Sequence, residues 1–194
     1  LAARATGADR RNPEYQYHHG LILKALNQFD ASEESLRRTI KLAPNHAEAC
    51  FNLGMMLVDQ ARADEGMRLV RTAAQLAPQD PDAQNGLALA LLKLGQTDDA
   101  EVAFGSTLAL SPNHEDARGN LIKLLNLNDR PVEAEVVARD GFNLAPEDPA
   151  RIALLAQQLR RVERYDEALN YFEMVLARRP TDQTAALAYG ATLT

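Results

Sequence analysis

Hydrophobic residues recur along this chain at spacings of three and four residues, which is the period of one face of an α-helix. The apolar stripes come in pairs, because a short polar turn such as Asn27–Asp30 separates one stripe from the next. A proline follows each second stripe, and five of them stand 34 residues apart, at Pro44, Pro78, Pro112, Pro146 and Pro180. Proline lacks a backbone N–H and crowds the preceding turn, so each is expected to stop a helix. The pattern therefore predicts a hairpin of two antiparallel helices, repeated five times.

These hairpins align when the proline is counted as position 32 of its repeat. The repeats then span residues 13–46, 47–80, 81–114, 115–148 and 149–182. Residues 183–194 are the first helix of a partial sixth repeat or a cap, and residues 1–12 resemble the tail of a degenerate earlier repeat. One hairpin has too little core to fold alone, so stacked neighbours are expected to form one continuous domain.

Several columns of the repeat support close packing of the helices. Small residues recur at positions 8 and 20, as in Gly54 and Gly66, and are expected to let the two helix backbones of a hairpin approach. Position 24 is usually large but is Ala138 in the fourth repeat, where Gly141 follows at position 27. We therefore expect the fourth repeat to be thinly packed. His19 also departs from its column, since it stands at position 7, where leucine is usual.

The period and these columns resemble the tetratricopeptide repeat family, which has a 34-residue helix–turn–helix unit with small residues at positions 8, 20 and 27 and proline at position 32. The resemblance covers residues 13–194. It implies an all-α fold, a right-handed superhelical solenoid of antiparallel helix pairs with an extended concave face. In the family that face is lined by the first helices, mainly at positions 2, 5, 6, 9, 12 and 13, and it binds a partner protein or peptide.

Carrying those positions over residue by residue gives a set of candidate binding residues. The N-terminal half is mainly apolar, and such an exposed patch is typical of a binding site. The C-terminal half combines cations with amides and favours an acidic or amide-rich segment. In the alternative interpretation, some of the apolar side chains pack between repeats and the cations are simply solvated. The candidate groove residues are Tyr17, Leu21, Lys24, Phe51, Asn52, Met55, Asn85, Leu89, Asn120, Lys123, Gln157, Arg160 and Arg161.

Two binding devices known in the family are incomplete or absent here. A ladder of asparagines at position 6 can hold a peptide backbone, since each amide both donates and accepts. Only Asn52 and Asn120 stand at that position, and His18, Gly86 and Leu154 interrupt the ladder. The carboxylate clamp for chaperone C-termini needs Lys at position 5 and Asn at position 9 of its first repeat, and no repeat has that pair. Chaperone-tail binding is therefore not expected.

Composition removes several classes of function. With 21 Lys and Arg against 27 Asp and Glu, the net charge is −6, which argues against nucleic acid as a partner. Cys50 is the single cysteine, so an internal disulfide or a cysteine-based zinc cluster is excluded. His46 and His114 both fall at position 34, in loops, and are expected to be structural or solvated. No phosphate-binding loop or nucleophile–base arrangement is visible, so we predict no catalytic, cofactor-binding or metal-binding residue and no enzyme activity within this segment.

The chain starts at Leu1 without an apolar signal core, and no apolar run is long enough to cross a bilayer. Direct membrane insertion is therefore not expected, and a soluble protein, cytoplasmic rather than periplasmic, is favoured, although the compartment stays open. Both ends look cut from a longer polypeptide. The main hypothesis is a protein–protein interaction scaffold. One alternative is the substrate-recognition region of a larger enzyme, such as a glycosyltransferase, a sulfotransferase or a peptide-modifying oxygenase. Another is a homo-oligomer that assembles through the solenoid ends.

Overall fold

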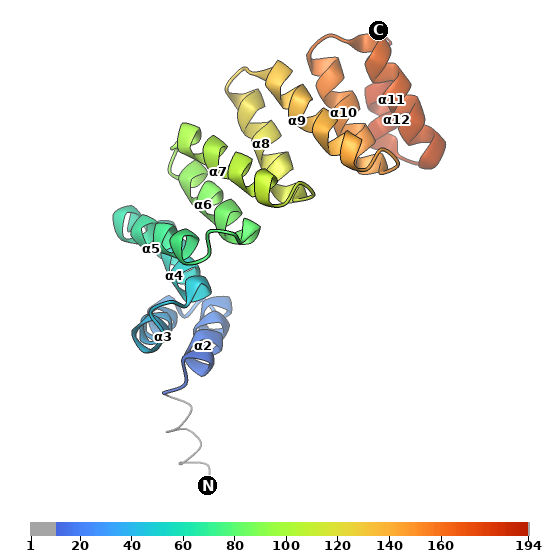
Figure 1. Cartoon of the computed structure of the whole chain (residues 1–194). Helices are drawn as coiled ribbons and strands as arrows, with labels where there is room; N and C mark the ends of the chain where they lie inside the picture. The colour runs from blue at the N-terminus through green and yellow to red at the C-terminus, as the bar shows by residue number, and fades with distance from the viewer. Residues whose placement is uncertain (1–10, 194) are drawn as a thin grey trace. The chain divides into compact units, whose positions relative to one another are not determined.

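The computed structural model describes residues 11–193, so most of the segment 1–12 expected to belong to an earlier repeat lies outside the described residues. The described part is all-α, and each first helix of a pair begins at the first residue of a predicted repeat (Figure 1). This confirms the predicted array of helix hairpins. The helices are α2 (Pro13–Ala25), α3 (Phe29–Leu42), α4 (Ala47–Asp59), α5 (Ala63–Leu76), α6 (Pro81–Lys93), α7 (Thr97–Leu110), α8 (Glu115–Leu127), α9 (Pro131–Leu144), α10 (Pro149–Arg161), α11 (Tyr165–Arg178) and α12 (Gln183–Gly190).

The chain divides into two compact units, residues 1–103 (unit one) and 104–194 (unit two), and the division falls inside α7. In unit one, α2 packs against α3 and α4 against α5, while α3–α4 and α5–α6 contacts join successive hairpins. In unit two, α8 packs against α9, α9 against α10, α10 against α11 and α11 against α12. Each of these helices therefore packs against a neighbour in sequence, as stacking of short hairpins requires.

The cores form where the apolar stripes of neighbouring helices meet. In unit one, Leu36, Leu53, Met56 and Leu57 are almost fully buried in one cluster, and Tyr17 packs against its edge. Unit two buries a comparable set from all of its hairpins, and each such side chain contributes about 1.5–3 kcal/mol relative to remaining exposed. These residues are Leu121, Ile122, Leu124, Leu125, Ile152, Leu155, Leu159, Phe172 and Val175.

The small residues at positions 8 and 20 bring helix backbones together in the second repeat. A Cβ atom added to Gly54 would lie 2.8 Å from the carbonyl oxygen of Gly66, and one added to Gly66 would lie 2.6 Å from that of Gly54. Both distances are shorter than real Cβ contacts, so only glycine fits at either position. The predicted close approach of α4 and α5 is confirmed.

Position 34 supplies a capping side chain to the first helix of each described hairpin. Asp80 Oδ1 accepts a hydrogen bond from the backbone N–H of Asp82 at 3.0 Å, and Asn12 and Asp148 accept from the N–H two residues on in the same way. Asp182 accepts from the N–H of residue 185, also at 3.0 Å. His46 and His114 use Nδ1 instead, and accept from the N–H groups of residues 49 and 117 at 3.3 and 3.2 Å. The structural role expected for these histidines is thus confirmed, as helix N-caps.

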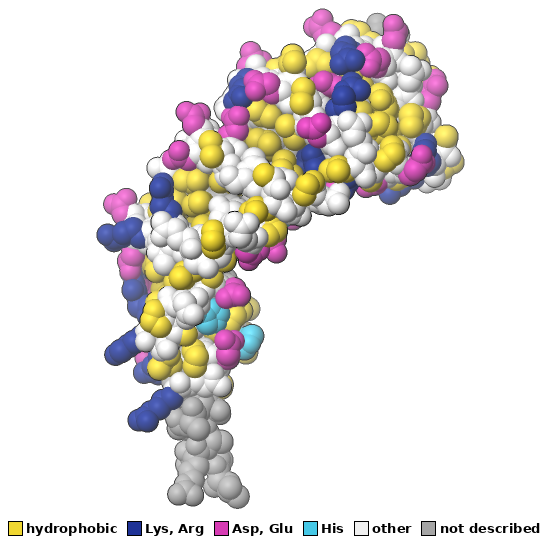
Figure 2. Space-filling model, viewed as in Figure 1, with side chains coloured by type: hydrophobic (Ala, Val, Ile, Leu, Met, Phe, Trp, Pro, Cys, Tyr) yellow, Lys and Arg dark blue, Asp and Glu magenta, His cyan; other side chains and the backbone are white. Residues whose placement is uncertain are grey.

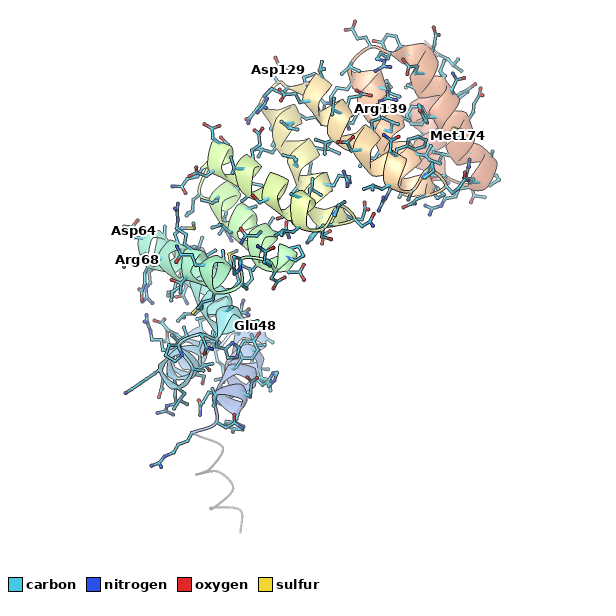
Figure 3. The ribbon with its side chains drawn as sticks, in the orientation of Figure 1. Glu48, Asp64, Arg68, Asp129, Arg139 and Met174 are labelled. Atoms are coloured by element: carbon cyan, nitrogen blue, oxygen red, sulfur yellow. The ribbon has the colours of Figure 1, made fainter. Side chains whose placement is uncertain are left out.

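Position 15 adopts a left-handed backbone conformation in all five turns between paired helices. The residues there have φ between 58° and 72°, and only Gly95 is a glycine. Asp129, labelled in Figure 3, occupies this position between α8 and α9. This conformation costs most L-residues about 1–2 kcal/mol, and it costs Asn or Asp less. Ala61 and Glu163 have no such tolerance, so the packing of the two flanking helices imposes the left-handed conformation on them.

The fourth repeat is not thinly packed, which corrects the expectation from Ala138 and Gly141. The side chain of Arg118 crosses from α8 and lies over Gly141, so that only 3% of Arg118 is exposed. Its guanidinium donates to the carbonyl oxygens of Val137, at 3.0 Å, and Pro112. The absent side chain at position 27 is thus replaced by the stem of an arginine from the first helix.

Candidate functional site

The first-helix face, defined here as positions 2, 5, 6, 9, 12 and 13 of α2, α4, α6, α8, α10 and α12, contains the predicted binding residues. In unit one, Asn52 links two of them. Its Nδ2 donates to the Tyr17 hydroxyl at 3.3 Å, and its Oδ1 accepts from Lys24 Nζ at 3.5 Å. Asn52 Nδ2 also donates to the carbonyl oxygen of Glu48 at 3.0 Å. The structure thus brings Tyr17, Lys24 and Asn52 together as a bridge between α2 and α4.

The apolar candidates of unit one are half-buried. The ring of Phe51 lies over Gly86 of the next first helix, where an added Cβ would be 2.5 Å from Phe51 Cε2. Phe51 therefore packs between repeats, as the alternative interpretation allowed. Asn85 is half-buried as well, and its Oδ1 is enclosed without a hydrogen-bond partner among the described residues. Leu21, Met55 and Leu89 are also half-buried, so each leaves some apolar surface on this face.

Acidic and histidine side chains surround Tyr17. Its ring lies 4.6 Å from that of His46, centroid to centroid, and His46 contacts the carboxylates of Glu14 and Glu48 at 3.7 and 3.0 Å. Figure 2 shows histidines beside acidic side chains on unit one, and Figure 3 labels Glu48. Burial raises the pKa of the Tyr17 hydroxyl, and the charges of Glu48 and Glu14 raise it further. Tyr17 therefore acts at neutral pH as a hydroxyl group that donates and accepts hydrogen bonds.

In unit two, three successive first helices enclose a pocket of about 550 Å³. Its floor includes an amide pair, in which Asn126 Nδ2 donates to Gln158 Oε1 at 2.9 Å. Three of the predicted binding residues, Gln157, Arg160 and Arg161, line it, and all three are exposed. The lining residues come from α8, α10 and α12, with Tyr165 from α11 and Ala191 directly after α12: Asn126, Gln157, Gln158, Arg160, Arg161, Tyr165, Thr184, Ala188 and Ala191.

Two further candidates of unit two do not line this pocket. Lys123 is exposed on α8, and the described residues offer it no ion pair. Asn120 is half-buried on the same helix, one turn before Lys123. The structure thus gathers the α10 candidates around one pocket and leaves the two α8 candidates outside its lining.

Sequence reasoning missed two kinds of pocket residue. Thr184, Ala188 and Ala191 occupy positions 2, 6 and 9 of the partial sixth repeat, so extending the position rule to that repeat would have found them. Gln158 stands at position 10 and Tyr165 at position 17, at the start of a second helix, and the rule for first helices includes neither position. The contribution of these two residues follows from the fold and not from the repeat pattern.

The described residues offer little other chemistry. Within residues 11–193 no group of three or more His, Cys, Asp or Glu side chains is placed to hold a metal ion. Cys50 is 1% exposed, and burial raises the pKa of its thiol, so the reactive thiolate is disfavoured. None of the helices between residues 11 and 193 is both long and apolar enough to span a bilayer.

Comparison with solved structures finds similar helical arrays at low sequence identity. MamA has a TM-score of 0.69 and 17% identity, covering 89% of this chain and 94% of MamA. YrrB, described as a tetratricopeptide repeat protein with an unusual peptide-binding site, has a TM-score of 0.67 and 17% identity, covering 96% of both chains. PilF of Pseudomonas aeruginosa has a TM-score of 0.66 and 16% identity, covering 93% of this chain and 90% of PilF. At these identities the likeness shows the fold.

Family models identify the repeats from the sequence itself, whereas a search of curated proteins gave no match. Three tetratricopeptide repeat models match residues 57–109 and 91–159, residues 17–81, and residues 152–186. The first of these models alone spans more than half of the chain. The two matches of the first model begin 34 residues apart, which is the length of one repeat, and the chain belongs to the tetratricopeptide repeat family.

Proposed function

We propose that this chain is a protein–protein interaction scaffold that binds a partner protein or peptide on its first-helix face. The observation that supports this most directly is the pocket of unit two, because three successive first helices form it and three predicted binding residues line it. Tetratricopeptide repeat arrays generally mediate protein interactions, and the description of YrrB as having a peptide-binding site agrees with this reading. Each matched family model describes repeats, and we assign the segment a binding role without catalysis of its own.

The binding mechanism that we propose is capture on a rigid surface. The side chains of the first-helix face project from helices whose opposite sides are buried in the cores, so they are held in place before a partner arrives. A pre-organised surface loses less conformational entropy on binding than a flexible one. The amides of Asn120 and Gln157 can bond to a peptide backbone, and the half-buried Leu21 and Leu89 offer apolar contacts.

Selection of binders from a random peptide library tests this proposal. Peptides that bind the wild-type chain would be titrated by calorimetry against Lys123→Ala/Gln157→Ala/Arg160→Ala, in which every changed residue is exposed on the first-helix face. We expect at least a tenfold rise in Kd for peptides that contact unit two, because charged hydrogen bonds contribute about 1.5–3 kcal/mol each.

The matched control changes exposed arginines on second helices and their caps. Arg68 on α5, labelled in Figure 3, and Arg179 after α11 are both exposed. Arg68→Ala/Arg179→Ala should leave both Kd and the helical circular dichroism unchanged. Peptides that bind the wild type, the triple variant and the control with equal affinity would show that the first-helix face is not the binding surface.

A further inference from the structure

The charge pattern of the pocket in unit two specifies its ligand more narrowly, and the inference drawn from it rests on the proposed function. We infer that it takes an internal peptide segment with two closely spaced Asp or Glu side chains, whose carboxylates bind Arg160 and Arg161. Both arginines belong to the last turn of α10, both line the pocket, and both are exposed. No acidic side chain is among the described lining residues, so the pocket itself leaves their charges uncompensated.

Most other arginines of unit two already have a carboxylate partner, which sets this pair apart. For Arg160 and Arg161 the described residues provide neither an ion pair nor a side-chain hydrogen bond. Arg179, which lies outside the pocket, also has no ion pair among the described residues and so offers an internal control. The paired arginines are Arg130 with Glu133, Arg139 with Glu135, Arg151 with Glu115, Arg164 with Glu167, and Arg178 with Glu147.

The remaining lining groups fit a peptide rather than a free anion. Guanidinium groups bind carboxylates through two parallel hydrogen bonds, so two arginines match two carboxylates. Gln157 and Thr184 can each donate and accept, as the backbone N–H and C=O of an extended segment require. The volume of about 550 Å³ lies within the range of about 300–1,000 Å³ that is typical of ligand pockets, so a short segment fills it.

The same observations disfavour a nucleic acid. Binding to a phosphate backbone neutralises many charges in a row, whereas this pocket has two cations and the chain has a net charge of −6. A carboxylate-bearing peptide needs only the two cations that the pocket offers. The amide floor formed by Asn126 and Gln158 adds polar surface without further charge.

The test uses a fluorescein-labelled hexapeptide of alternating Glu and Ala with an amidated C-terminus, measured by fluorescence anisotropy on the full chain. We expect saturable binding that weakens with added NaCl, and a rise in Kd of at least tenfold in Arg160→Ala/Arg161→Ala. Arg160→Lys/Arg161→Lys keeps the charge but lacks the planar guanidinium that binds a carboxylate through two hydrogen bonds, so it should bind with intermediate affinity. Arg179→Ala should bind like the wild type, and the matched hexapeptide of alternating Lys and Ala should not bind.

Several results would overturn the inference. These are absence of binding by the acidic hexapeptide, equal weakening in Arg179→Ala, displacement by inorganic phosphate at equal concentration, and comparable binding of a neutral hexapeptide with a free C-terminal carboxylate. If the acidic hexapeptide does not bind but library peptides lose affinity in the triple variant Lys123→Ala/Gln157→Ala/Arg160→Ala, this inference is wrong and the proposed function still stands. If library peptides bind the triple variant with the same Kd as the wild type, the proposed function itself is wrong.

Discussion

The side chain of Arg118 lies directly over Gly141, so that a Cβ atom added to Gly141 would be 2.6 Å from Arg118 Cδ and 2.8 Å from its Nε. The two residues come from the two helices of one hairpin, α8 and α9. Burial lowers the pKa of Arg118, although the charges of Glu115 and Asp140 oppose this effect. The missing side chain of one helix is therefore what allows a buried arginine on the other.

Gly141→Ala is expected to destabilise the chain despite its favourable effect on helix propensity. Replacing an interior helical glycine by alanine gains about 1 kcal/mol, whereas inserting a methyl group into a filled site costs about 1–3 kcal/mol. The contact is with the stem of Arg118, which is tied at its end to two carbonyl oxygens and cannot easily move away. Urea unfolding should show a net loss of free energy of unfolding.

In an Arg118→Ala background, the effect of Gly141→Ala on the free energy of unfolding should change sign. Once the stem is gone, Gly141→Ala meets open space and should stabilise the variant by about 0.5–1 kcal/mol. Gly105→Ala on α7 is the matched control, since a Cβ there has no heavy atom within 4 Å, and it should stabilise the wild type. Additive effects of Arg118→Ala and Gly141→Ala in the double-mutant cycle would contradict the packing relationship.

A second prediction concerns the left-handed turn residues. Ala61 has φ of 63° and stands at the position that Gly95 occupies in the next repeat. Ala61→Gly should therefore raise the free energy of unfolding by about 0.5–1 kcal/mol, the relief of strain minus the greater entropy of glycine in the unfolded chain. Urea unfolding measures the gain. Asn27→Gly should gain less, because Asn tolerates this conformation, and an equal gain at both positions would contradict the explanation.

The repeat columns were sufficient to predict the hairpins, their boundaries and the close approach at Gly54 and Gly66, because those features depend on residue size and spacing alone. The columns did not reveal why position 34 matters, since Asn, His and Asp look unrelated until each is seen to accept a bond from the helix N-terminus. Side chains that cross between helices were also hidden. Arg118 fills the space at Gly141 from 23 positions away, and no local pattern encodes that contact.

The candidate binding residues were likewise predictable only in part from the sequence. The position rule placed Gln157, Arg160 and Arg161 on one face, and the structure finds them around one pocket. The rule could not distinguish free groups from engaged ones. Asn52 is hydrogen-bonded to Tyr17 and Phe51 is packed on Gly86, because these details depend on the distance between neighbouring first helices.

A third prediction follows from the capping role of His46. His46→Ala removes the acceptor for the N–H of residue 49 and the ring contact with Tyr17, and should cost about 1–2 kcal/mol of stability. His46→Asn keeps a capping oxygen, as Asn12 provides for α2, so its cost should be smaller by about 1 kcal/mol. Denaturant unfolding of the two variants compares these costs. His18→Ala, at an exposed position outside the caps, should have little effect, and equal losses in the Ala and Asn variants of His46 would argue against capping.

The last prediction concerns acid stability and an ion-pair network between α3 and α5. Glu33 accepts hydrogen bonds from Arg37 Nη2 at 2.7 Å and from Arg62 Nη1 at 2.8 and 2.9 Å, and both arginines also bind Glu65. Burial alone would raise the pKa of Glu33, but the hydrogen bonds from Arg37 and Arg62 outweigh it and lower the pKa below its ordinary value of 4.5. The folded state therefore holds this carboxylate ionised at a pH where the unfolded chain binds a proton.

Because the pKa of Glu33 is depressed on folding, its contribution is fully present above the unfolded pKa and disappears as the pH falls through the folded one. Glu33→Gln should lower the free energy of unfolding by up to about 1 kcal/mol at pH 7, a modest amount because the side chains of both arginine partners are 45% and 42% exposed. The difference from wild type should shrink steadily when urea unfolding is repeated at lower pH, below 4.5. Glu34→Gln is the matched control, since the Glu34 carboxylate is 75% exposed and lies 3.7 Å from the guanidinium of Arg38. A Glu33→Gln deficit that stays constant with pH would mean that the loss comes from packing and not from the charge of the carboxylate.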